Sequence, residues 1–276
     1  MIQPITSVGE CLDFMGTFYE DPQFSDPMLS DKEQFQRNFA RAMEKPETHC
    51  TWGIFRDGKM IGLFTFLVLP EEKYLEMLVG LCRDRDGYRE ILEHLEGHYP
   101  GYDADFVFSP QNFLLKSALQ KRGAEFEPEQ QKMVLKSPAP QEDTSGVEAY
   151  TPQYARQYFA IHNQDMYWTG EKVAAATERF RTYLALHEGK VVGYLDVTCC
   201  FAENEIYDLL VLPEYRRMGY GGKLLAKAVQ ENGPKGMMLL VDADNEPAIR
   251  LYERAGFVKK PYANSLTAHW KVQSII

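Results

Sequence analysis

Residues 205–223 read EIYDLLVLPEYRRMGYGGK, an apolar run that ends in a glycine-rich turn. The run at 205–212 has the length and apolar content of a buried strand. Apolar residues at helical spacing follow the glycines and predict a helix over 219–232. A glycine-rich turn at a helix N-terminus binds anions readily, because free N–H groups and the positive end of the helix dipole point at the ligand. This stretch therefore favours an α/β fold with an anion site at the turn.

The rest of the C-terminal half can be divided into elements on either side of this turn. Hydrophobic periodicity and turn residues predict the order β-α-α-β-β-β-α-β-α-β-β. The expected elements are a strand at 147–150, helices at 151–163 and 170–180, a hairpin over 183–193, a strand at 205–212, a helix at 219–232, a strand at 236–241, a helix at 247–255 and two strands within 258–272.

The chain repeats itself, which indicates a duplication. GKMIG at 58–62 returns as GKVVG at 189–193, an offset of 131 residues. EMLV at 76–79 aligns with DLLV at 208–211, and the segment 112–123 aligns with 245–256, at offsets of 132 and 133. The Pro- and Ser-rich segment 136–146 is typical of a linker. We therefore expect one domain over 1–137 and a second over 146–276.

Composition limits the possible partners. Hydrophobic residues make up 45% and charged residues 25%, and the net charge is −10. That charge argues against nucleic acid, because phosphate backbones select basic surfaces. The first twenty residues have no basic segment of a secretory signal, and no apolar run approaches the ~20 residues that span a bilayer. We expect a cytoplasmic protein without a metal, since its six His and five Cys lack ligand spacing. The oligomeric state stays open, and a monomer is compatible with the sequence.

Two motifs in the second copy resemble the GNAT superfamily of N-acetyltransferases. Arg216, Gly219 and Gly221 match its motif A, R-x-x-G-x-G, on a strand-to-helix turn. The residues that resemble its motif B, N-x-x-A-x-x-L-Y-x-x-x-G-F, are Asn245, Ala248, Leu251, Tyr252, Gly256 and Phe257. The resemblance implies two tandem GNAT-like domains, each a mixed, mostly antiparallel twisted sheet flanked by helices.

The resemblance also implies an activity and a cofactor site. The activity is transfer of an acetyl group from acetyl-CoA, as co-substrate, to a primary amine of a small molecule or peptide. In such proteins the strand before the turn pairs with pantetheine, and an N–H, here best placed at Leu209, stabilises the oxyanion. Asn245 would anchor the pantetheine arm or cap the next helix. The full set implied for acetyl-CoA is Leu209, Leu210, Val211, Arg216, Arg217, Met218, Gly219, Tyr220, Gly221, Gly222, Lys223 and Asn245.

Two catalytic residues follow from the same resemblance. Tyr252 is in register with the general acid that protonates the CoA thiolate; its alternative role is that of a core tyrosine. An ammonium of pKa about 10.4 must first lose a proton, at roughly 4–5 kcal/mol near neutral pH, so a base is useful. Glu205 occupies the strand position of the base in histone-type members, with Asp208 and Glu203 as competitors. Ribosomal-protein-type members carry a glutamate on the next strand, where this chain has Leu240.

The acceptor side and the first copy are less defined. Tyr167 and Trp168 lie between the two early helices, next to acids, and are a candidate acceptor site or simple packing. In the first copy, Gly87 aligns with Gly219, and the residues that replace Arg216, Gly221 and Tyr252 are Asp84, Arg89 and Leu119. We therefore expect a degenerate first copy. Alternative functions are transfer of a longer acyl or an aminoacyl group, and a non-catalytic CoA-binding sensor.

Overall fold

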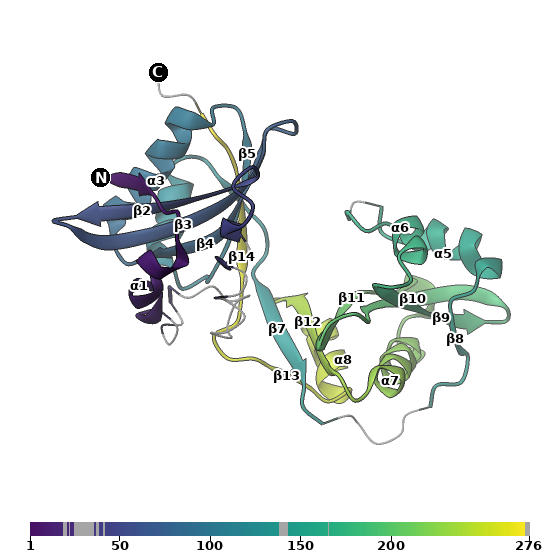
Figure 1. Ribbon diagram of the computed structural model, residues 1–276. Coiled ribbons are helices and arrows are strands. Elements are labelled where there is room, and N and C mark those ends of the chain that lie inside the picture. Colours follow the sequence, from purple (N-terminus) through teal and green to yellow (C-terminus); the bar gives the residue numbers. More distant parts are fainter. Residues whose placement is uncertain are drawn as a thin grey trace. The chain divides into compact units, whose positions relative to one another are not determined.

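The chain folds into two compact α/β units. The computed structural model describes residues 1–18, 21, 23–24, 36, 39–40, 42–137, 143–164 and 166–273. One unit consists of residues 1–130 and 261–276, and the other of residues 131–260 (Figure 1). No helix within the described ranges is long and apolar enough to cross a membrane.

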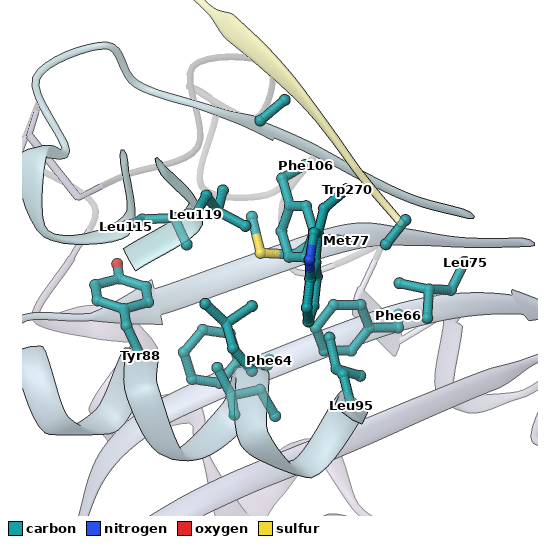
Figure 2. Close-up of a cluster of buried hydrophobic side chains, with 14 of the residues drawn as sticks. Phe64, Phe66, Leu75, Met77, Tyr88, Leu95, Phe106, Leu115, Leu119 and Trp270 are labelled. Atoms are coloured by element: carbon teal, nitrogen blue, oxygen red, sulfur yellow. The ribbon is translucent and has the colours of Figure 1, made fainter. Parts of the chain in front are cut away.

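A seven-stranded mixed sheet forms the first unit, in the order β1-β2-β3-β4-β5-β14-β6. The strands are β1 Ile2–Pro4, β2 His49–Arg56, β3 Lys59–Leu69, β4 Tyr74–Cys82, β5 Asp103–Phe108, β6 Glu125–Phe126 and β14 Leu266–Lys271. The helices are η1 Val8–Glu10, α1 Leu12–Gly16, α3 Arg85–His98 and α4 Phe113–Gln120. Figure 2 shows the core, in which Phe64, Phe66 and Phe106 of the sheet pack with Leu95 of α3 and Leu115 of α4.

The second unit repeats this plan. Its seven-stranded sheet has the order β13-β7-β12-β11-β10-β9-β8. The strands are β7 Gln130–Leu135, β8 Val147–Ala149, β9 Phe180–His187, β10 Lys190–Thr198, β11 Glu203–Val211, β12 Gly236–Asp242 and β13 Phe257–Lys259. The helices are η2 Pro152–Tyr154, α5 Ala155–Ile161, α6 Gly170–Ala175, η3 Pro213–Tyr215, α7 Tyr220–Asn232 and α8 Glu246–Arg254. In Figure 1, α5 and α6 cover one face of the sheet, and α7 and α8 cover the other.

Two features of the repeat are confirmed residue by residue. The hairpin turns match, because Gly58 and Gly189 both adopt positive φ, at 75° and 79°. The caps match as well: Asn112 accepts a hydrogen bond at the start of α4, and Asn245 does so at the start of α8. These turns and caps are strong local signals, which is why the sequence alone could align them.

The register predicted between the two central strands is wrong. β4 pairs with β5 up to Met77, and β11 pairs with β12 up to Ile206, so these two residues are equivalent. The offset there is 129, whereas the alignment of 76–79 with 208–211 gave 132. Apolar strands resemble one another at several registers, so a match of this kind does not fix the pairing.

The two units exchange their last strands, which the predicted boundaries at 137 and 146 did not include. β7 lies between β12 and β13 of the second sheet, and β14 lies between β5 and β6 of the first. β7 is antiparallel to β13, and β14 is antiparallel to β5 and β6. Both strands expected at 258–272 therefore exist, as β13 and β14, but β14 completes the other copy. Alternation of apolar residues predicts a strand and not the sheet that it joins.

The exchange makes a reciprocal prediction about stability. Trp270 on β14 is 3% exposed in the first core, and Met133 on β7 is fully buried in the second. Trp270→Ala should cost the first unit about 3–5 kcal/mol through the cavity that it leaves. Hydrogen exchange of β5 amides should speed up while that of β12 amides stays unchanged. Met133→Ala is the matched control with the opposite pattern, and exchange that speeds up in β12 alone for Trp270→Ala would contradict the strand order.

Candidate functional site

The two central strands of the second sheet part midway along their length. β11 pairs in parallel with β12 only over Glu203–Ile206, whereas its antiparallel pairing with β10 continues to Val211. The N–H of Leu212 donates to Val192 of β10, at 2.9 Å. Because successive backbone groups alternate in direction, the N–H groups of Leu209 and Val211 point to the open side. A ligand can therefore extend the β11 ladder there.

A β-bulge at Tyr207 precedes this open edge. Asp196 of β10 pairs with Asp208 and Val197 with Ile206, so Tyr207 is the extra residue. Beyond the bulge, Leu209 and Val211 pack against the core beneath α7 and α8, while Leu210 packs on the α5 side. By alternation, Asp208 shares the α5 side with Leu210.

An uncapped helix N-terminus lies beyond the open edge. Residues 212–219 connect β11 to α7, and Gly219 at the N-cap has φ 88° and no side chain to cap the helix. The first-turn N–H groups of α7 are therefore open to an anion. Arg217 is exposed at φ 63°, and Met218 is 53% exposed. The geometry fits a diphosphate.

Other residues predicted around this loop have contacts within the protein. Arg216 Nε donates to Val211 O at 3.0 Å, which fastens the loop to the strand end. Lys223 forms an ion pair with Asp143 at 2.8 Å. Tyr220 Oη lies 2.7 Å from His187 Nδ1. A Cβ on Gly221 would lie 3.0 Å from Leu251 Cδ2, so this glycine serves close packing of α7 on α8.

Asn245 acts as a helix cap. Its side chain accepts a hydrogen bond from the N–H of Ala248 at 3.2 Å, at the start of α8. The capping alternative for this residue is therefore shown, and contact with pantetheine stays a prediction.

Tyr252 lies on α8 at the edge of the second core, 9% exposed. Burial, together with the nearby charge of Asp208, raises its pKa to about 12. Its hydroxyl has no hydrogen-bond partner among the residues that the structure describes. The side chain is therefore protonated near neutral pH and has a proton to donate.

The three carboxylates of β11 have different surroundings. Glu203 is 46% exposed and forms an ion pair with Lys132 at 3.2 Å. Burial raises the pKa of Glu205, and the charges of Lys132 and Arg179 oppose that rise. Asp208 Oδ2 accepts from Tyr194 Oη at 2.6 Å, and burial is the main reason that its pKa is raised.

A buried polar cluster on the α5 face was not predicted from the sequence. His162 Nε2 lies 3.0 Å from Asp196 Oδ2, and both side chains are fully buried. Tyr158 Oη and Thr182 Oγ1 also donate to Asp196, at 2.9 and 2.6 Å. His162 Nδ1 lies 2.9 Å from Asn163 O, an acceptor only, so this nitrogen donates.

These contacts define the charge of the pair. Asp196 accepts hydrogen bonds from three side chains, Tyr158, His162 and Thr182. Both ring nitrogens of His162 face acceptor oxygens, an arrangement that favours the protonated ring. Burial alone would lower the pKa of His162, but the hydrogen bond and charge of Asp196 outweigh it and raise the pKa. No sequence spacing links the two residues, because α5 and β10 bring them together only in the fold.

The predicted acceptor residues differ in their roles. Tyr167 is 74% exposed, and the amino group of Lys172 lies 4.1 Å from its ring centroid. Trp168 packs edge-on against Phe180, at 5.1 Å between centroids, with the guanidinium of Arg179 5.0 Å from its own centroid. Trp168 therefore joins the α6 region to β9, and its contact with a substrate stays a prediction.

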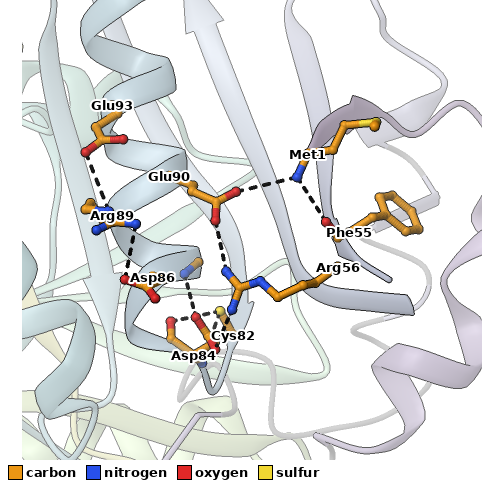
Figure 3. A network of polar contacts seen from close by, with 10 residues as sticks. Met1, Phe55, Arg56, Cys82, Asp84, Asp86, Arg89, Glu90 and Glu93 are labelled. Atoms are coloured by element: carbon orange, nitrogen blue, oxygen red, sulfur yellow. Dashed lines mark hydrogen bonds and ion pairs between the residues drawn. The ribbon is translucent and has the colours of Figure 1, made fainter. Parts of the chain in front are cut away.

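The first unit has the same open edge without the loop. β4 pairs with β5 only up to Met77, yet only Arg83 and Asp84 separate β4 from α3. Asp84 accepts from the N–H of Gly87 at 2.9 Å and forms an ion pair with Arg56 at 3.2 Å (Figure 3). The N-terminus of α3 is thus capped by a carboxylate of its own. Asp84 is the counterpart of Gly219, so the alignment of Gly87 with Gly219 is wrong.

Two further features of the described residues concern ligands. They contain no group of three His, Cys, Asp or Glu that could hold a metal ion. A cavity of about 530 Å³ lies between α3 and α4 of the first unit, with side chains of both charges around it. None of the candidate residues of the second unit lines it.

The buried ion pair predicts how stability depends on pH. The pKa of His162 is raised in the fold, so its contribution is complete below the ordinary value of about 6.5 and is lost as pH rises through the folded value. The free energy of unfolding of the second unit should therefore fall over that range. His162→Gln should be less stable at low pH and should lack this fall. Urea titrations followed by hydrogen exchange in β10 measure both proteins, and parallel pH curves would contradict the charged pair.

The comparisons agree with this geometry. The model of the acetyltransferase (GNAT) family matches residues 147–257. A mycothiol acetyltransferase from Corynebacterium aurimucosum is 42% identical over 59 residues, 20% of this chain and 19% of that protein. The chain therefore matches about a fifth of the length of that relative.

Solved structures share the whole fold. A GCN5-related N-acetyltransferase from Sphaerobacter thermophilus has a TM-score of 0.65 at 15% identity, over 100% of this chain and 97% of that one. A tandem GNAT protein from the clavulanic acid pathway has a TM-score of 0.58 at 16% identity, over 100% and 99%. The chain thus has a tandem GNAT fold, and residues 147–257 match the model of the GNAT acetyltransferase family.

Proposed function

We propose that the second unit transfers an acetyl group from acetyl-CoA to a primary amine of a small molecule or peptide. The observation that carries the proposal is the open edge of β11 leading through residues 212–219 to the uncapped start of α7. The edge supplies backbone donors for a pantetheine arm, and the helix start supplies them for a diphosphate. The family match, and a relative named mycothiol acetyltransferase, support this chemistry.

The loop and the strand would bind different parts of the acetyl-CoA donor. Arg217 to Gly222 would surround the diphosphate, with Arg217 as an exposed cation of the loop. Leu209 would direct its N–H at the thioester carbonyl and stabilise the oxyanion as it forms. This N–H costs no reorganisation, because the parting of β11 from β12 has already left it without a strand partner.

Proton transfer requires an acid and a base. Tyr252 would protonate the CoA thiolate, a role that its raised pKa and unpaired hydroxyl support. The acceptor ammonium must lose a proton first, and the carboxylates on the relevant stretch of β11 are Glu205 and Asp208. Sequence position indicates Glu205 as the base, whereas the surroundings of the two carboxylates differ.

The first unit would contribute no second site. Its α3 starts two residues after β4, and Asp84 already caps the helix. A diphosphate there would meet a carboxylate and would lack a loop to enclose it. We propose that this unit has a structural role. Its strands β5 and β6 are the neighbours with which β14 pairs. A cytoplasmic location also stays a prediction from the sequence.

Calorimetry with acetyl-CoA tests the loop assignment. We expect one site per chain, and Arg217→Glu should weaken binding about 10- to 100-fold, the loss of one charged hydrogen bond or more. The cleaner choice is Arg217, because replacing Gly221 would disturb its contact with Leu251. Lys259→Glu, an exposed charge reversal on β13, is the control and should bind normally. Unchanged affinity for Arg217→Glu would contradict the diphosphate site.

The same titration separates the alternatives. Binding of acetyl-CoA without transfer to any amine of a broad panel would indicate a sensor. Tighter binding and faster transfer from a longer acyl-CoA would indicate a different acyl group.

Tyr252→Phe tests the general acid. The variant should lower kcat about 10²- to 10⁴-fold, because the thiolate must then leave unprotonated. Acetyl-CoA affinity should stay unchanged, since the hydroxyl makes no contact that holds the fold. Tyr183→Phe, a tyrosine 1% exposed in the same core, is the matched control and should keep its kcat. Wild-type turnover by Tyr252→Phe would remove this residue as the acid.

A further inference from the structure

We propose that Asp208, positioned by Tyr194, takes the proton from the acceptor ammonium, and that Glu205 serves as a counter-ion for Lys132 and Arg179. This inference rests on the acetyl transfer proposed above. Asp208 would be the residue of that site that decides whether the amine can attack.

Asp208 lies next to the backbone donor that would hold the thioester. It directly precedes Leu209, on the segment of β11 that has left β12. The Leu209 N–H is close enough to the Asp208 carboxylate to influence its pKa, and Asp208 in turn influences Tyr252 on α8. The carboxylate therefore adjoins the donor that would act on the acyl carbon, and its charge acts on Tyr252.

One oxygen of Asp208 is fixed, and the other is available. Tyr194 Oη donates to Oδ2 at 2.6 Å, and the N–H of Asn163 donates to the same Tyr194 oxygen at 3.3 Å. The Tyr194 ring stacks on His162, with 4.8 Å between centroids and 12° between planes. The Leu209 N–H also acts on the carboxylate as a backbone donor, but no other side chain among the described residues binds Oδ1, so this oxygen can accept a proton from an ammonium.

The groups that face Asp208 set its basicity. Burial and the charge of Asp196 on β10 raise its pKa, while Tyr194, the imidazolium of His162 and the Leu209 N–H lower it. Tyr252 on α8 and Tyr207 on β11 are neutral near neutral pH, because their own pKa values are raised. The net result is a carboxylate with a raised pKa, which makes it a better base than an exposed aspartate.

Glu205 has the opposite surroundings. Lys132, 6% exposed, and Arg179 both act on it as nearby positive charges. Arg179 Nε is buried without a partner among the described residues, and its guanidinium lies 5.5 Å from the Phe180 ring centroid. Burial still raises the pKa of Glu205 overall, so the difference from Asp208 is that two cations beside Glu205 repel an incoming ammonium.

The protons balance along this route. The N–H bond of the ammonium breaks and an O–H bond forms on Asp208, which leaves the amine with a free electron pair. That pair forms the C–N bond with the acyl carbon, and the C–S bond breaks as Tyr252 gives its proton to sulfur. The phenolate then takes the second proton from nitrogen, and Asp208 releases its own to solvent. Because Asp208 is neutral during attack, it does not repel the oxyanion beside Leu209.

Steady-state kinetics of the full chain tests the assignment, with two acceptors from the panel. One is a primary alkylamine, which is protonated near neutral pH, and the other is hydroxylamine, which is mostly unprotonated there. Asp208→Asn keeps the size of the side chain and should lower kcat for the alkylamine about 10²- to 10⁴-fold, with unchanged acetyl-CoA affinity as the check on folding. The loss with hydroxylamine should be far smaller. Glu205→Gln should lose at least about tenfold less than Asp208→Asn.

Tyr194→Phe adds a test through the pH profile, which should not change if Tyr194 has only a structural role. It removes a hydrogen bond that lowers the pKa of Asp208, so the acid limb of kcat/KM should shift to higher pH. Full activity of Asp208→Asn, an equal loss with both acceptors, or an unmoved limb in Tyr194→Phe would overturn the inference while wild-type transfer stands. Wild-type protein that binds acetyl-CoA and acetylates neither acceptor would instead overturn the proposed function, and the inference with it.

Discussion

The parting of β11 from β12 after Ile206 is the constraint on which the second unit depends. A strand with free N–H groups inside a sheet is costly unless a ligand or water pairs with them. β11 stays in place because its other edge remains bonded to β10 up to Val211, and its side chains are held on both faces. The unit thus keeps a set of unpaired donors in fixed positions, which is what recognition of an extended ligand requires.

The two faces of β11 carry different chemistry. Beneath α7 and α8 the core is apolar and includes Leu224, Leu225 and Ile249. Beneath α5 the face carries a buried ion pair, His162 with Asp196, and the tyrosine that holds Asp208. Breaking one side of such a pair costs about 3–5 kcal/mol, so the network fixes the tyrosine as firmly as packing would. An apolar core at this face would leave Asp208 without a fixed orientation.

Sequence patterns predicted the structural features that depend on residues close together in the chain. The helices α7 and α8, the cap at Asn245 and the glycine turn all follow from signals a few residues long. The buried pair of His162 and Asp196 did not, because 34 residues separate them and only the fold brings them together. The exchanged strands were missed for the same reason, since alternation gives a strand its faces and not its sheet. The choice between Glu205 and Asp208 likewise depends on two cations, one from β7 and one from the loop before β9.

The first unit has the same fold without the cofactor site proposed for the second unit. It retains the parted strands, with β4 paired to β5 only up to Met77, and it retains a bulge at Leu78. It differs in the connection to the helix, which is two residues long where the second unit has eight. Parted strands are therefore insufficient, because a diphosphate also needs a loop and an uncapped helix. Since β14 completes the first sheet and β7 the second, losing either copy would remove an internal strand from the other. That dependence gives a physical reason for a chain to keep a copy whose own helix start is closed.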